Sequence, residues 1–111
     1  MLPKSHRLNK KDINRLYKKG KVFKEDFLVL RVNSNFTDHF RAAVIIPKAV
    51  ANKATVRNRL KRKTMTILAP FKLEPKNIDL ALFFKKEPRE EEIQPALIKI
   101  LTKAGIAVGT K

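Results

Sequence analysis

The sequence predicts an α+β fold, a compact two-layer sandwich of sheet and helices in the order α-β-β-α-β-α. Three stretches carry helix caps or apolar residues at helical spacing, and three short runs are rich in β-branched and aromatic residues. The 111 residues fit a single domain spanning 1–111, and a hydrophobic fraction of 43% suffices for one core. We expect residues 1–8 and 106–111 to be flexible, because the ends of a chain with such a high net charge fray.

A first helix is predicted over residues 10–19. Asn9 is a favoured N-cap, Asp12 places a carboxylate near the helix N-terminus, and Gly20 suits the C-terminus. The helix has one apolar face, because three side chains share it at i, i+3 and i+4 spacing: Ile13, Leu16 and Tyr17.

Three strands are predicted over residues 27–32, 40–46 and 78–84. The intervening residues 33–38 have turn chemistry, so the first two strands are predicted to form an antiparallel pair. Pro47 ends the second strand, because proline lacks the N–H that a ladder needs. The third strand is largely apolar, which predicts that both of its faces are buried.

Two more helices complete the predicted order. One spans residues 55–69 and carries an apolar stripe for packing on the sheet: Val56, Leu60, Thr64, Ile67 and Phe71. The other spans residues 91–104, with Gly105 at its C-terminus and acidic residues 90–92 at its N-terminus, where the helix dipole favours negative charge. Pro95 fits this helix only in the first turn, where backbone N–H groups have no helical partner.

The charge of the chain indicates a polyanionic partner. Lys and Arg number 26 against 10 Asp and Glu, which gives a net charge of +16 and a pI near 10.5. Phosphate binding releases condensed counterions, so nucleic acid is the expected partner. The chain has no cysteine, which excludes disulfides and thiolate sites. It also lacks an apolar run of about 18 residues, so we expect a cytoplasmic protein without membrane contact.

The basic residues concentrate in one helical segment. Residues 48–63 contain seven Lys and Arg and no acidic residue. No acidic side chain lies one helical turn away to neutralise them, so they repel one another until an anion binds. Arginine forks bind phosphate bidentately, and an asparagine amide both donates and accepts near a base or ribose. The predicted RNA-binding residues are Lys48, Lys53, Arg57, Asn58, Arg59, Lys61 and Arg62.

The segment Arg57-Asn58-Arg59 resembles the Arg-Asn-Arg motif of the bacterial ribonuclease P protein family. Two further segments resemble the opening of that family: Leu2-Pro3-Lys4 with His6-Arg7-Leu8, and Leu16-Tyr17-Lys18-Lys19-Gly20-Lys21. The resemblance covers roughly residues 2–104. It implies a protein that binds a catalytic RNA subunit and assists removal of the 5′ leader from precursor tRNA, with Mg²⁺ bound mainly by the RNA.

The resemblance also implies details of fold and site. The fold would contain a left-handed βαβ crossover, contrary to the usual hand. A central cleft would bind the single-stranded leader by charge and aromatic stacking. Carried over to this chain, the cleft residues are Tyr17, Lys19, Ile13, Phe27 and Leu30, with charge from Lys48 nearby. Ile13 and Leu30 stand where the family often has aromatic residues.

No protein catalytic centre is predicted. His6 and His39 are interpreted as surface residues, and residues 90–92 as a helix start rather than a metal site. The protein is expected to be monomeric apart from the RNA. The main alternative is a ribosomal or ribosome-associated RNA-binding protein. A helix-turn-helix DNA binder is disfavoured because a strand, not a helix, precedes residues 55–63, and a nuclease acting alone is disfavoured because candidate catalytic residues do not cluster.

Overall fold

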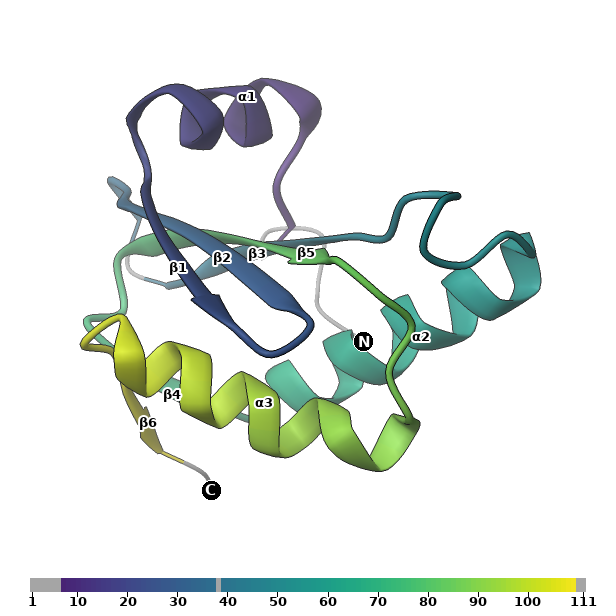
Figure 1. Cartoon of the computed structure of the whole chain (residues 1–111). Helices are drawn as coiled ribbons and strands as arrows, with labels where there is room; N and C mark the ends of the chain where they lie inside the picture. Colours follow the sequence, from purple (N-terminus) through teal and green to yellow (C-terminus); the bar gives the residue numbers. More distant parts are fainter. Residues whose placement is uncertain (1–6, 38, 110–111) are drawn as a thin grey trace.

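The computed structural model describes residues 7–37 and 39–109 and has an α+β fold (Figure 1). Within that range the chain forms three helices and six strands. Their bounds, in chain order, are α1 (Lys10–Lys19), β1 (Lys21–Glu25), β2 (Leu28–Ser34), β3 (Arg41–Ile45), α2 (Ala54–Leu68), β4 (Lys72–Glu74), β5 (Ile78–Phe84), α3 (Glu90–Lys103) and β6 (Ala107–Gly109).

Four of the strands form a mixed sheet in the order β1-β2-β5-β3. β2 pairs antiparallel with β1 and with β5, whereas β3 pairs parallel with β5. The predicted antiparallel pairing of β2 with β3 is therefore wrong, because β5 lies between them. The parallel β3–β5 pair needs a long crossover connection, and the segment containing α2 and β4 supplies it.

Three strands were absent from the predicted order. β1 is an edge strand with a mixed charged and apolar sequence, and most of it is exposed. β4 and β6 have three residues each and pair only with one another. Such short or charged strands give almost no periodic signal, because their stability comes from the neighbouring strand and from packing.

The sheet is covered on both faces, which corrects the two-layer prediction. Figure 1 shows α1 on one side of the sheet and α2 with α3 on the other. Strand register explains the division. Leu30 and Val44 both lie beside Leu82 on the face that α2 and α3 cover. Their neighbours along the strands, Arg31 and Ala43, both lie beside Ala81 and point to the opposite face. The main hydrophobic core lies between the sheet and α2 with α3.

Local sequence signals position the helices. α1 begins and ends as predicted, with a reciprocal capping box between Asn9 and Asp12. Gly20 follows α1 in extended conformation, where a Cβ atom would lie 2.6 Å from the Leu16 carbonyl oxygen. α2 and α3 match the predicted helices to within one residue at each end.

Two local predictions for these helices need correction. Pro95 is the sixth residue of α3, counted from Glu90, and so lies beyond the first turn. Pro95 has no backbone N–H, so the helical hydrogen bond to the Glu91 carbonyl is missing. Both residues are exposed, so water can donate to that carbonyl instead. Phe71 is buried as predicted but lies after the end of α2 rather than on its stripe.

Both expected flexible ends are partly engaged with the rest of the fold. Residues 1–6 and 110–111 lie outside the described residues. Arg7 forms a β-bridge to Ala42, and the Leu8 N–H donates to the Ala42 carbonyl at 3.1 Å. Ile106 is buried and β6 pairs with β4. Residues 106–109 thus pair with β4 and pack on the core, while the flexibility of the chain ends stays a prediction. Over the described range, none of the helices is long and apolar enough to cross a membrane.

Candidate nucleic-acid interface

One face of α2 lines a groove along the edge strand β3. Asn58, Lys61 and Arg62 contribute its polar wall, and Met65 continues the same helix face. Arg7, Leu8 and Ile13 lie on the other side, with residues 42–45 of β3 at the floor. The groove has a volume of about 420 Å³. It therefore combines three cationic side chains with the backbone of an edge strand, a donor-rich surface suited to phosphate.

The two arginines of the motif are engaged within the protein. Nη1 of Arg57 donates to the carbonyl oxygens of Ala51 and Asn52 at 2.8 and 2.9 Å. Nε of Arg59 lies 3.4 Å from Oε1 of Glu90, at the start of α3. Arg57 thus holds the loop before α2, while Arg59 bridges two helices. Neither lines the groove, in contrast to Asn58, Lys61 and Arg62.

The start of α2 is open to an anion. Lys53 occupies the N-cap position without a side-chain capping bond, and the first turn contains no acidic residue. Lys48 is exposed in the preceding turn. This turn is closed by hydrogen bonds from the N–H groups of Val50 and Ala51 to the Pro47 carbonyl. The free N–H groups and positive dipole end of the helix add to these two charges.

A second surface lies on the other side of the sheet, around Tyr17. The Tyr17 side chain is 51% exposed although it faces the sheet side of α1. Its ring centroid lies 5.2 Å from that of Phe83, with the two planes tilted by 55°. The Arg31 guanidinium lies 4.6 Å from the Tyr17 centroid and 5.9 Å from that of Phe83. We call Tyr17, Phe83 and Arg31 the aromatic platform.

The platform shares only Tyr17 with the predicted cleft. Phe27 and Leu30 are 2% and 0% exposed and belong to the core on the opposite face, so their predicted place in the cleft is wrong. Ile13 is half-buried and lines the groove of α2 instead, while Lys19 is exposed at the end of α1. Ile13 therefore lies on the side of α1 that borders the groove and is not part of the aromatic platform.

Sequence reasoning missed Arg31 and Phe83. Strand alternation contains the signal, because Arg31 follows Leu30 and Phe83 follows Leu82, and neighbours along a strand face opposite ways. That signal becomes usable only when β2 and β5 are known to pair, with Arg31 beside Ala81 and Val29 beside Phe83.

The comparisons with known proteins identify the family. The family model described as Ribonuclease P matches residues 2–105. This chain belongs to the ribonuclease P protein family. The ribonuclease P protein component of Synechocystis sp. is 38% identical over 72 residues, which cover 63% of this chain and 58% of the relative. That of Staphylococcus aureus strain JH9 is 39% identical over 64 residues, which cover 56% and 54%. The chain thus aligns with somewhat more than half the length of these relatives.

Solved ribonuclease P proteins share the fold. The Staphylococcus aureus protein superposes with a TM-score of 0.76 at 24% identity, covering 91% of this chain and 96% of that one. The Thermotoga maritima protein gives a TM-score of 0.75 at 23% identity, covering 87% and 96%. The resemblance stated for the family is therefore confirmed for sequence and for overall architecture.

The described part of this ribonuclease P family member contains no group of three or more His, Cys, Asp or Glu side chains placed to hold a metal ion. His39 is half-buried at the entrance to β3, and its carbonyl accepts hydrogen bonds from Asn35 and Thr37. His6 lies outside the described residues. The polar chemistry that the two surfaces offer is cation and hydrogen-bond donation to phosphate and stacking on bases.

Proposed function

We propose that this chain is the protein subunit of ribonuclease P, the endoribonuclease that removes the 5′ leader from precursor tRNA. The observation that carries the proposal is the family match over residues 2–105, together with a basic α2 whose groove residues belong to the family's motif region. The chemistry is carried by the catalytic RNA, and the protein contributes binding and charge neutralisation.

We assign contact with the catalytic RNA to α2 and the loop before it. Asn58, Lys61 and Arg62 reach phosphate and ribose through the groove, while Lys48 and Lys53 meet the backbone at the helix start. Arg57 and Arg59 shape this surface through their bonds to the loop and to Glu90, and their remaining donors face the RNA. The absence of acidic residues from 39 to 73 favours such a contact.

We assign contact with the leader to the aromatic platform. A single strand is held by stacking on aromatic rings and by cations along its backbone. Tyr17 offers a half-exposed ring, and Arg31 keeps a positive charge at that ring. Lys19 at the end of α1 and Ile13 beside the groove extend the path on either side. This path leads from the platform to the groove that lies against α2.

Several further properties belong to the same proposal. Mg²⁺ is held mainly by RNA phosphates, as the family resemblance implies. The protein forms a single domain, acts as a monomer apart from the RNA, and works in the cytoplasm. The crossover from β3 through α2 to β5 is left-handed, as the family resemblance implies.

Reconstitution tests the proposal. The protein is mixed with a bacterial ribonuclease P RNA and a precursor tRNA, and cleavage is measured across a Mg²⁺ titration. We expect cleavage at near-physiological Mg²⁺ only when both components are present, because the protein replaces part of the cation requirement. Equal cleavage with and without the protein at every Mg²⁺ concentration would contradict the assignment. Binding to ribosomal RNA with no effect on cleavage would favour a ribosomal protein.

A further inference from the structure

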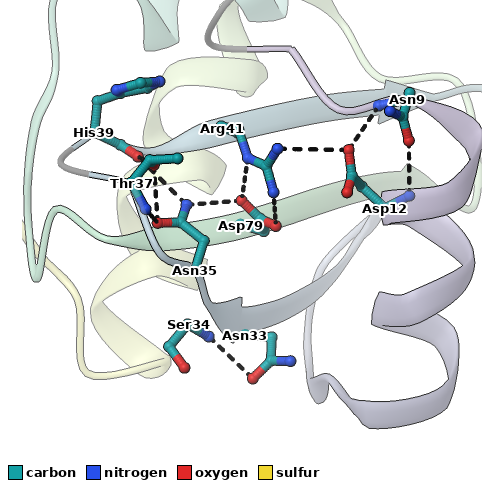
Figure 2. Close-up of polar contacts among 9 residues, drawn as sticks. All are labelled: Asn9, Asp12, Asn33, Ser34, Asn35, Thr37, His39, Arg41 and Asp79. Atoms are coloured by element: carbon teal, nitrogen blue, oxygen red, sulfur yellow. Dashed lines mark hydrogen bonds and ion pairs between the residues drawn. The ribbon is translucent and has the colours of Figure 1, made fainter.

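An ion-pair network lies where β3 and β5 begin, and it joins the partly buried Arg41 to two buried carboxylates. Arg41 of β3 binds Asp79 of β5 through two parallel bonds, Nε to Oδ1 at 2.8 Å and Nη2 to Oδ2 at 2.7 Å. The remaining Nη1 lies 3.6 Å from Oδ2 of Asp12 in α1. Figure 2 shows Arg41 between the two carboxylates. One guanidinium therefore joins two strands of the sheet to the first turn of α1.

Asp12 serves two partners at once. Its backbone N–H donates to Oδ1 of Asn9 at 2.9 Å, and its Oδ2 accepts from the Asn9 N–H at 3.3 Å, which closes the capping box. The same Oδ2 atom faces Arg41 (Figure 2). The cap and the ion pair therefore share one oxygen, which links the first turn of α1 to Arg41.

The sheet end of the network is held by further hydrogen bonds. Oδ1 of Asp79 also accepts from the Asn35 amide at 2.7 Å, and that amide donates to the His39 carbonyl at 3.3 Å. Asp79 and Asn35 are 5% and 8% exposed, so the pair is shielded from water and ions. The hydrogen bond to Asp79 raises the pKa of Arg41 above its ordinary value, against the opposing effect of burial. The guanidinium thus stays charged and anchored.

We propose that Arg41 is a positioning residue for leader binding: through Asp12 it sets the place of α1, and with it Tyr17, relative to Arg31 and Phe83 on the sheet. Tyr17 lies five residues after Asp12, about 7.5 Å along the same helix. The first turn is tied to the sheet by Arg41, Leu16 is buried beneath the middle, and Tyr17 packs beside Phe83. This inference rests on the leader contact proposed above.

Asp12→Asn tests the tether with the least disturbance. The amide has the shape of the carboxylate, so its oxygen still accepts from Asn9, but the charge that attracts Arg41 is lost. The matched control is Glu25→Gln, which breaks the surface pair of Glu25 with Lys103 at 3.5 Å and changes the net charge equally. Any general effect of charge on RNA affinity is then the same in both variants.

The first readout needs no RNA. Tyr17 is the sole tyrosine of a chain without tryptophan, so its emission and its quenching by iodide report directly on the platform. We expect Asp12→Asn to change both, because the Tyr17 ring moves relative to Arg31, while Glu25→Gln leaves them as in the unmodified chain. Emission and quenching that are identical in the two variants would overturn the proposal.

The second readout uses the reconstituted ribonucleoprotein. The quantity is the ratio of affinities for precursor tRNA with a long leader and for the same tRNA without one. We expect Asp12→Asn to lower this ratio about fivefold, the effect of losing one partly shielded ion pair, and to leave affinity for the catalytic RNA equal to that of Glu25→Gln. An unchanged ratio in a variant that unfolds cooperatively would overturn the proposal.

The design separates this inference from the proposed function. If the unmodified protein itself gives a ratio of one, the leader assignment fails, whereas the tyrosine readout still tests the tether. If Asp12→Asn does not fold, Asp12→Glu replaces it, since its longer side chain keeps the charge but displaces the helix. Asp12→Glu is expected to change the emission and quenching of Tyr17. If both are identical to those of the unmodified chain, the inference is wrong.

Discussion

The two basic helices α1 and α2 lie on opposite faces of one sheet and are built in different ways (Figure 1). α1 has a reciprocal capping box, an ion-pair tether at its first turn and an aromatic ring on its sheet side. α2 has no side-chain cap and no acidic residue in its first turn, and it is held by burial of Leu60, Thr64 and Leu68. The sequence stabilises one helix locally and leaves the start of the other open.

The difference matches the two modes of RNA contact proposed for these surfaces. At α2 the interaction is one of charge with phosphate, so it must weaken steeply as salt rises. At the platform it is stacking on a ring that Arg31 and Phe83 orient, which depends far less on salt. Stacking requires that the helix hold the ring at a fixed position relative to the base. Attraction between a cation and a phosphate requires only that the helix direct the cation toward the RNA.

The largest expected effect is at the groove of α2. Lys61→Gln with Arg62→Gln removes two of the cations proposed to bind phosphate and is expected to lower affinity for the catalytic RNA about 100-fold, as two charge-assisted hydrogen bonds are lost. The slope of log affinity against log salt should flatten by about one to two. Filter binding across a salt series measures both.

The control for that variant carries the same charge change elsewhere. Lys72→Gln with Lys76→Gln alters exposed lysines near β4, in a pocket distinct from the groove. We expect a much smaller loss of affinity. Equal losses in the two variants would mean that α2 acts only through the total charge of the protein.

The second-largest loss of binding is expected at the aromatic platform. Tyr17→Ala removes the half-exposed ring and is expected to weaken binding of leader-bearing precursor tRNA about tenfold, within the range for one stacked base. The loss should be the same at low and high salt, unlike that at α2. Tyr17→Phe is the matched control and should retain binding. A tenfold loss with Tyr17→Phe as well would attribute the effect to the hydroxyl group and not to stacking.

A smaller effect is expected for Arg57. Arg57→Ala loses the bonds to the Ala51 and Asn52 carbonyls and should lower the free energy of unfolding by about 1 kcal/mol. Urea denaturation measures the change. An unchanged stability combined with reduced RNA affinity would show that the guanidinium leaves the loop to bind RNA.

The smallest effect is expected for Arg59. Its pair with Glu90 joins side chains that are 60% and 47% exposed, and such surface pairs contribute less than about 1 kcal/mol. Arg59→Ala and Glu90→Gln should therefore each leave the urea midpoint nearly unchanged. A combined fall in stability as large as that of Arg57→Ala would place Arg59 among the residues that hold the fold.

Local signals in the sequence predicted much of the fold. The caps of α1, the apolar stripe of α2 and the apolar run of β5 depend on neighbouring residues, and the structure has these elements within about one residue of the predicted bounds. The pairing of β2 with β3 could not be predicted in the same way. β5 lies between them although it begins more than 30 positions after the end of β3, and residues 28–45 contain no pattern that predicts this insertion.

The same limit applies to the site. The motif on α2 is contiguous, so its residues could be found from the sequence, but the partners that engage Arg57 and Arg59 come from the loop and from α3. The platform depends on a period of two along β2. Leu30 and Arg31 are adjacent, and only the pairing with β5 decides which one lies beneath α1.

A crosslinking measurement can test directly whether α2 and the aromatic platform contact different RNAs. The chain has no cysteine, so Lys61→Cys and Tyr17→Cys each create a single attachment point for a photocrosslinker. In the reconstituted complex, the probe at position 61 is expected to crosslink to the catalytic RNA and the probe at position 17 to the leader of precursor tRNA. Crosslinks from both positions to the same RNA would contradict the claim.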